Sequence, residues 1–194
     1  MIKANSNIKD LLAEYTAKLN SLSKGGQGYD STLREVATTM RAEVSRRIHS
    51  DGKNSNDAVI GNYSTKSMYV SLSAIPRPKG VGRGKGGKTK FENGKPHKSK
   101  YYAGGYFGYK TDVGRNRLGT VNLSLTGQVS NQFSVIATSD SYGLGWSNTE
   151  MQNRAAALEK KYGQDSFKVW ALTEAELNLS NEIAQNQINK ILNS

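Results

Sequence analysis

Cysteine is absent from this 194-residue chain, and histidine occurs only twice. The lack of cysteine excludes a disulfide scaffold and thiolate metal sites. His49 and His97 have no second histidine at a ligand spacing such as H-x-x-x-H, so we expect both to be solvated rather than metal-binding or catalytic. Because no nucleophile–base pair stands out either, the sequence predicts a protein that is not an enzyme and that binds no cofactor.

Long apolar runs are also missing. No segment approaches the length of a membrane-spanning helix, and the first residues, MIKANSNIKDLL, lack the apolar core of a signal peptide. We therefore expect synthesis in a cytoplasm and no membrane partner. With 36% hydrophobic residues and a mean hydropathy of −0.64, the chain is polar for its size. Its length suits one domain with a long projecting insertion.

Acidic residues are almost absent from one segment that is rich in basic ones. Nine of the 27 Lys and Arg residues lie between Arg77 and Lys100, where Glu92 is the only acid, so this segment carries most of the net charge of +11. Its many glycines, together with Pro78 and Pro96, predict an extended, flexible arm without a regular helix or central strand. We expect the arm to contact a polyanion or neighbouring subunits.

The arm contains a literal match to the phosphate-binding pattern G-x-x-x-x-G-K-[ST], GRGKGGKT at 82–89. A working loop of this kind leaves a buried strand and opens a helix, whereas Pro76 and Pro78 precede this one and Asn93-Gly94-Lys95-Pro96 follows it. The context argues against nucleotide binding. A nucleotide-dependent enzyme is a third interpretation, and it would require Lys88 to be essential for hydrolysis.

Hydrophobic periodicity predicts helices and strands on both sides of the arm. Helices are expected at about 7–22, 30–49, 147–163 and 173–191, and strands at 66–72, 133–137, 142–146 and 167–172. Capping boxes are predicted at Thr32/Glu35, Ser147/Glu150 and Thr173/Glu176. This order predicts an α+β fold, in which helices pack on a small, mostly antiparallel sheet.

The apolar stripes of these elements define a predicted core. Arg34, Arg41, Arg46 and Arg47 lie largely off the stripe of the second helix, so we expect a solvated face there, with nucleic-acid contact as the alternative. The residues expected to face the core are Val36, Met40, Val44, Phe133, Val135, Leu158, Trp170 and Leu177.

Tyrosines crowd the segment that follows the arm, YYAGGYFGYKTDVGR at 101–115. Nucleic-acid bases stack on aromatic faces, so tyrosine beside lysine and glycine is typical of a nucleic-acid surface. A place in the core or at a subunit interface is an equally good interpretation. The predicted contact residues of the arm and this cluster are Arg77, Lys79, Arg83, Lys85, Lys88, Lys90, Lys95, Lys98, Lys100, Tyr101, Tyr102 and Tyr106.

The second half of the chain carries a series of short motifs: LSLTG at 123–127, a Gly-rich strand at 142–146, A-x-x-x-E-x-x-x-G from Ala155 to Gly163, and VWALT at 169–173. This series resembles the neck or tail-completion proteins of tailed bacteriophages, best over 121–194 and more loosely at 30–49 and near Lys66. The chain departs from the family at 168–172, where members commonly carry R-P-F-[LFI], and in the length of its arm.

The resemblance implies one small α+β connector domain over 1–194, with an N-terminal helix at 1–25 and the flexible arm at 77–100. It implies a structural virion subunit, made in the host cytoplasm, that forms a homo-oligomeric ring joining head to tail around the DNA channel. Expected partners are head-closure, portal or tail-tube proteins and packaged DNA. The alternative is a nucleic-acid-binding module that uses the arm and the tyrosine cluster, and both hypotheses predict salt-sensitive affinity for DNA.

Overall fold

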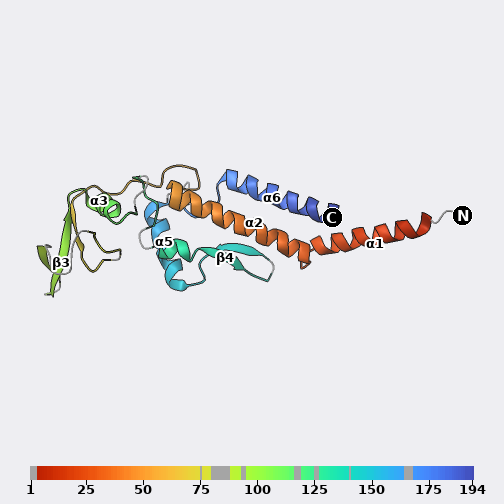
Figure 1. The fold of residues 1–194 in the computed structure, drawn as a ribbon, viewed down its shortest axis with the longest axis horizontal. Coiled ribbons are helices and arrows are strands. Elements are labelled where there is room, and N and C mark those ends of the chain that lie inside the picture. Colours follow the sequence, from red (N-terminus) through yellow and green to blue (C-terminus); the bar gives the residue numbers. More distant parts are fainter. Residues whose placement is uncertain are drawn as a thin grey trace. The chain divides into compact units, whose positions relative to one another are not determined.

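A computed structural model describes residues 4–74, 76–79, 88–92, 95–115, 119–124, 127–139, 141–163 and 168–194, with the backbone alone at 4–11 and 88–98. The fold is α+β, as the sequence predicts, with helices and two small antiparallel sheets (Figure 1). The chain divides into two compact units. The helical unit comprises Met1–Val44, Phe133–Ser147 and Leu172–Ser194, and the sheet unit comprises Ser45–Gln132 and Asn148–Ala171. A single domain over the whole chain stays a prediction.

The helical unit contains three long helices and one β-hairpin. The helices are α1 (Ala4–Leu22), α2 (Gln27–Arg46, as far as Val44) and α6 (Glu174–Asn193), and the hairpin pairs β4 (Ser134–Ala137) with β5 (Tyr142–Gly145). The predicted capping box of α6 is confirmed. The Thr173 hydroxyl accepts the Glu176 amide at 3.0 Å, and the Glu176 carboxylate accepts the Thr173 amide at 2.8 Å.

The hairpin is joined to α2 at both of its ends. Arg41 Nε donates to the carbonyl of Phe133, just before β4, at 2.8 Å. The hydroxyl of Tyr142, the first residue of β5, donates to the Asp30 carboxylate at 2.7 Å. The ring of Phe133 packs on Trp146, which follows β5, with centroids 5.0 Å apart, so the two ends of the hairpin's open side are joined by aromatic packing.

Burial confirms part of the predicted core and corrects the rest. Met40, Val44 and Phe133 are buried. The prediction for Leu177 is wrong, because about half of its side chain is exposed. Helical spacing alone places Leu177 on the stripe of α6, but no described neighbour covers it enough to bury it. The other predicted core residues are partly buried: Val36, Val135, Leu158 and Trp170.

The sheet unit is built around a three-stranded antiparallel sheet in the order β1-β3-β2. Its strands are β1 (Met68–Ser71), β2 (Lys88–Glu92) and β3 (Lys95–Tyr102). The unit also contains the π-helical turn η1 (Arg47–Asp51) and the helices α3 (Gly105–Asp112), α4 (Gln128–Asn131) and α5 (Thr149–Tyr162). The predicted alternation in the first strand is confirmed, since Val70 is buried in a cluster with Tyr102 and Tyr109.

The central strand of this sheet comes from the predicted arm. The expectation that 77–100 contains no central strand is wrong for β3, because β3 pairs with β2 over Lys95–Ser99 and with β1 over Ser99–Tyr102. Tertiary pairing overrides weak strand propensity, and the buried cluster beneath β1 holds the far end of β3 in register. Residues 80–87, which include Arg83 and Lys85, lie outside the described part of the chain.

The segment after α5 is held by side chains and forms no strand at 168–172, so that prediction is wrong. The buried Arg47 donates to the carbonyls of Val169 at 3.2 Å and Ala171 at 2.6 Å. The Glu159 carboxylate accepts the amide of Val169 at 2.9 Å. Because side chains bond both the N–H and the C=O of Val169, this residue is satisfied without a neighbouring strand.

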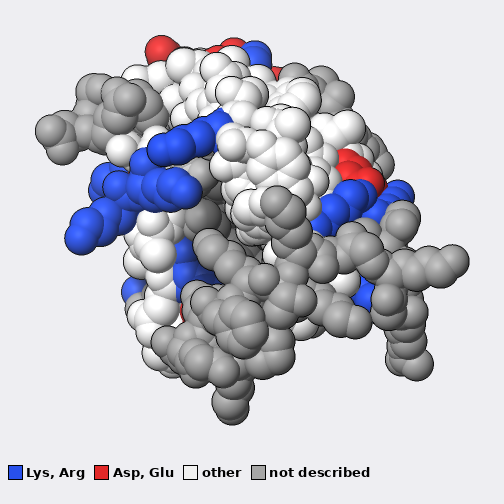
Figure 2. All heavy atoms as spheres, turned by 90° about the vertical axis from the view of Figure 1, so that its left-hand side faces the viewer, with Lys and Arg blue, Asp and Glu red and all other residues white. Residues whose placement is uncertain are grey.

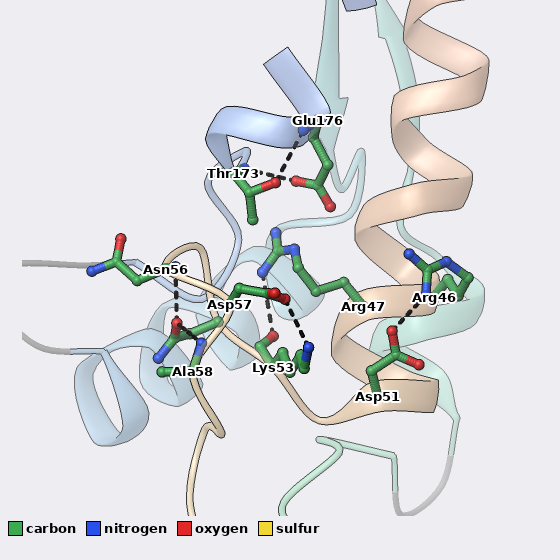
Figure 3. A network of polar contacts seen from close by, with 10 residues as sticks. Arg46, Arg47, Asp51, Lys53, Asn56, Asp57, Ala58, Thr173 and Glu176 are labelled. Atoms are coloured by element: carbon green, nitrogen blue, oxygen red, sulfur yellow. Dashed lines mark hydrogen bonds and ion pairs between the residues drawn. The ribbon is translucent and has the colours of Figure 1, made fainter. Parts of the chain in front are cut away.

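The buried position of Arg47 also corrects the expected solvated arginine face. Its guanidinium donates to the Lys53 carbonyl at 3.3 Å, beside the exposed Arg46–Asp51 ion pair (Figure 3). A planar guanidinium with several donors suits three backbone carbonyls that converge from different segments. Arg46, the preceding residue, faces solvent as predicted.

Two predicted capping boxes are also wrong. α2 begins at Gln27, so Thr32 lies inside the helix and its hydroxyl donates to the Gly28 carbonyl at 2.8 Å. α5 is capped by Asn148, one residue after the predicted Ser147, and the Asn148 side chain accepts the Glu150 amide at 2.8 Å. Asn is as good an N-cap as Ser, so the residue types alone do not distinguish Asn148 from Ser147 as the start of α5.

Candidate functional site

The first residues of the basic segment are joined to the end of α3. The carboxylate of Asp112 accepts hydrogen bonds from the Lys79 backbone amide at 2.9 Å, from Lys100 Nζ at 3.1 Å and from the Tyr102 hydroxyl. The Tyr109 hydroxyl, almost one turn earlier in α3, donates to the carbonyl of Pro76. These contacts, which we call the Asp112 anchor, give the basic segment a defined starting point on the sheet unit.

The ionisation states of the Asp112 anchor match its hydrogen bonds. Burial alone would raise the pKa of Asp112, but hydrogen bonds from Tyr102, Lys100 and the Lys79 amide together lower it. Burial and the bond to Asp112 raise the pKa of Tyr102, and burial followed by the charge of Asp112 raises the pKa of Tyr109. At neutral pH, Asp112 is therefore an ionised acceptor and both phenols are neutral donors.

Lys100 and Tyr102, two of the predicted contact residues, make their contacts inside the chain. Lys100 Nζ also donates to the Lys79 carbonyl at 2.6 Å and lies 5.0 Å from the centroid of the Tyr102 ring. Tyr102 is buried. A partner would have to compete with these bonds, so we assign both residues an anchoring role, and their contact with a partner stays a prediction.

Tyr101 lies on the exposed face of the sheet beside a tyrosine that the sequence did not identify. Tyr69 in β1 stands opposite Tyr101 in β3, and the two rings lie 5.1 Å apart with a 51° tilt. Both side chains are exposed. The alternation of Tyr69 with Met68 and Val70 indicates its outward direction, but its pairing with Tyr101 depends on a register that spans the whole basic segment.

Four of the remaining basic residues of the prediction lie in strands of the same sheet. Arg77 and Lys79 are exposed at the Asp112 anchor. Lys88, Lys90, Lys95 and Lys98 belong to β2 and β3, and Arg83 and Lys85 lie outside the described residues. In Figure 2, more blue surface of Lys and Arg than red surface of Asp and Glu is visible among the residues described. Lys88 and Thr89, which end the phosphate-loop-like pattern, are strand residues of β2.

Tyr106, the last predicted contact residue, belongs to an aromatic cluster. Its ring packs on Tyr63 with centroids 5.4 Å apart and on Tyr109 at 5.9 Å. Burial, and then the neighbouring tyrosines, raises the pKa of Tyr106 to about 12. Tyr63 and Tyr106 line one side of a pocket of about 410 Å³ in the sheet unit.

Lys110 lines the same pocket and was missed by the sequence analysis. Its side chain is 1% exposed, and Nζ donates to Asn122 Oδ1 at 3.1 Å and to the Ser124 carbonyl. Desolvation by burial, followed by the charge of Arg115, lowers the pKa of Lys110 to about 8. Lysine is normally exposed, and its acceptors here lie more than ten residues further along the chain, so no local pattern marks it.

His49 is partly buried rather than solvated, which corrects the expectation. Its Nδ1 lies 3.0 Å from the Asn122 carbonyl, and its ring centroid lies 6.0 Å from that of Trp170. Burial lowers the pKa of His49. Within the described residues no three His, Asp or Glu side chains are placed to hold a metal ion. Nor is any helix in the described ranges both long and apolar enough to span a bilayer.

The A-x-x-x-E-x-x-x-G motif of α5 has a structural explanation. The Glu159 carboxylate accepts hydrogen bonds from the amides of Val169 and Trp170. The Gly163 amide closes the helix on the Glu159 carbonyl at 2.6 Å, and a Cβ at Gly163 would lie 2.6 Å from that same oxygen. Glu159 therefore holds the backbone of Val169 and Trp170, and Gly163 ends α5.

Comparisons of the chain with family models, with curated proteins and with solved structures find no match. The class of the protein is therefore defined by its own fold: an α+β chain in which a lysine-rich sheet is anchored to α3. No relative assigns an activity or a partner to this arrangement.

Proposed function

We propose that this protein is a structural virion subunit of a tailed phage and that it forms a homo-oligomeric ring between head and tail. The resemblance of residues 121–194 to neck and tail-completion proteins supports this proposal. The observation that carries it is an apolar stripe on α1: Leu12, Tyr15 and Leu19 are 61%, 48% and 60% exposed. Their spacing of three and four residues places them on one face of the helix, where a partner would bury them.

A second apolar patch lies on α6. Leu177 and Ile188 are 49% and 38% exposed, and their separation of about three helical turns places them on the same side of α6. A two-fold dimer needs one self-complementary patch, whereas a head-to-tail contact needs two different ones and forms a ring when the rotation between copies closes. The partner that we propose for the α1 stripe is therefore the α6 patch of a second copy of this chain.

Native mass spectrometry and sedimentation velocity on the full chain test the ring. We expect one closed species larger than a dimer. Leu12→Gln with Leu19→Gln should produce monomers, and so should Leu177→Gln with Ile188→Gln. Val59→Gln, which changes an exposed apolar residue of the sheet unit, is the matched control and should leave the ring intact.

Mixing the two double variants sharpens this test. Each variant retains one intact patch, so a head-to-tail interface predicts that an equimolar mixture forms discrete heterodimers and nothing larger. A wild-type chain that stays monomeric at every concentration contradicts the ring. A ring that survives both double changes would show that these patches do not form its interface.

The alternative function, a nucleic-acid-binding module, is favoured by the exposed Tyr69–Tyr101 pair in a lysine-rich sheet. Tyrosine faces stack on unpaired bases, and lysines neutralise phosphates. Fluorescence anisotropy with single- and double-stranded DNA over a salt series tests this function. Lys88→Glu with Lys90→Glu should flatten the log–log salt dependence by about 0.9 per lost phosphate contact, whereas Lys160→Glu on α5 should not.

The result separates the two functions. A ring whose DNA binding is weak, salt-sensitive and independent of sequence supports the connector. A monomer that binds one sequence tightly, and loses single-stranded DNA on Tyr101→Ala, supports the module instead.

A further inference from the structure

The pocket beside α3 combines a buried positive charge with an absence of acidic groups. It has a volume of about 410 Å³, and none of the described residues that line it is Asp or Glu. Two of them are lysines, Lys110 and Lys161. An anion entering this pocket would therefore meet attraction and no fixed negative charge.

Lys110 supplies the charge at the buried end of the pocket. Among the described residues its ammonium contacts neutral groups only: Asn122 Oδ1 at 3.1 Å, the Ser124 carbonyl, and the face of the Tyr63 ring at 4.9 Å from the centroid. Among the described residues no carboxylate pairs with it. A buried charge without a counter-ion is costly, so an anion brought close to it would be stabilised. The lowered pKa of Lys110, about 8, agrees with a buried ammonium that has no carboxylate beside it among the described residues.

Two further phenols, besides that of Tyr63, line the pocket. Tyr106 is a neutral phenol at neutral pH, and burial raises its pKa further, to about 12; its hydroxyl has no hydrogen-bond partner among the described residues. Tyr162 also lines the pocket, and the exposed Lys161 lies 5.0 Å from the centroid of its ring. A neutral phenol and an ammonium are the donors that a carboxylate or phosphate accepts from.

We propose that this pocket binds a small organic anion, a carboxylate or phosphate carried on an apolar or aromatic stem. The Tyr106 hydroxyl and Lys161 Nζ donate to the oxyanion, and Lys110, whose own donors are occupied, acts through its charge. The stem packs among Tyr63, Tyr162 and Leu158, whose side chains give the pocket its apolar walls. This site is independent of the proposed ring, because all of its residues belong to the sheet unit.

The test titrates the full chain with phenyl phosphate, benzoate and the neutral benzyl alcohol, followed by calorimetry and by NMR of the tyrosine rings. We expect saturable binding of at least one anion, weakened by salt, with little binding of the alcohol. A stronger response to phenyl phosphate identifies a phosphate headgroup, and a stronger response to benzoate identifies a carboxylate; either supports the proposal. Binding should also raise the Lys110 pKa, followed on its ε-protons.

Three variants locate the site. Tyr106→Phe, which keeps the ring, and Lys161→Gln should each weaken the anion about tenfold, the effect of one lost charge-assisted hydrogen bond. Lys160→Gln, one residue outside the lining, is the matched control and should bind as the wild type does. The proposal is overturned if no anion binds at millimolar concentration, if benzyl alcohol binds as well as the anions, or if Lys161→Gln and Lys160→Gln behave alike.

Discussion

The carboxylate of Glu159 accepts the backbone amide of Val169 with both of its oxygens, at 2.9 and 3.2 Å. Ten residues separate the two, so the Glu159 side chain joins α5 to the segment at 168–171. Glu159 and Arg47 thus bond opposite sides of the same peptide segment, one through N–H groups and the other through carbonyls. This pairing connects the helix motif of the second half to η1, which Arg47 begins.

Replacing Glu159 should destabilise the protein. Glu159→Ala leaves the amides of Val169 and Trp170 without their acceptor, and we expect a loss of about 1–3 kcal/mol in the free energy of unfolding. Urea denaturation followed by circular dichroism measures it. Glu182→Ala, an exposed acid on α6, should change stability by less than about 0.5 kcal/mol. Equal effects would mean that the Glu159 contacts carry no net stability.

Two adjacent arginines should respond very differently to the same substitution. Arg47→Met removes the donor of three backbone carbonyls in a buried place, so a loss of at least about 2 kcal/mol is expected. Arg46→Met breaks the exposed ion pair to Asp51, which contributes about 0–1 kcal/mol. Thermal and urea unfolding of both variants check the difference. A stable Arg47→Met protein would contradict the structural role of this side chain.

The Asp112 anchor predicts a contrast between neighbouring tyrosines. Tyr102→Phe removes one donor to the Asp112 carboxylate and should cost about 1.5–3 kcal/mol, while Tyr101→Phe should be nearly neutral. Hydrogen exchange at the Lys79 amide should quicken in Tyr102→Phe, because that amide shares the same acceptor. Unchanged exchange at Lys79 would show that the anchor does not depend on Tyr102.

Stability should fall on mild acidification because of His49. Its folded pKa is lowered below 6.5, so the unfolded chain binds the proton more readily, and stability is lost as the pH falls through 6.5 toward the folded pKa. Urea midpoints from about pH 8 to about pH 5 measure this slope. His49→Gln should flatten it, and His97→Gln should leave it unchanged. A slope that persists in His49→Gln must come from other groups.

Replacing Gly80–Lys98 by a short Gly-Ser linker should leave the protein folded. The replacement removes β2 and half of β3, but it retains Ser99–Tyr102, the residues that pair with β1, and both ends of the Asp112 anchor. We expect a change in unfolding free energy within about 1 kcal/mol, checked by circular dichroism and melting. If the proposed function holds, particle assembly fails instead. A collapsed melting transition would make β2 part of the core.

Local patterns were sufficient for much of this fold. The Thr173/Glu176 box sets the start of α6, and the apolar runs around the turn at Asp140-Ser141 predict the β4–β5 hairpin, because these signals act between residues a few positions apart. The same holds for Met40 and Val44, whose helical spacing marks the buried side of α2. The predicted strand at 167–172 is wrong because Arg47, far away in sequence, and Glu159, ten residues before Val169, bond the backbone of Val169.

The candidate site, too, could be predicted only in part from the sequence. Composition identified the basic segment and the tyrosine-rich segment, and the α+β class followed from the order of patterns. Tertiary structure alone decided that β3 is a central strand, that Tyr69 faces Tyr101, and that Lys110 is buried. The physical reason is that a charge is buried, or a polar strand paired, only where distant segments supply acceptors and partners. The spacing of residues along the chain does not show which distant segments come together in the fold.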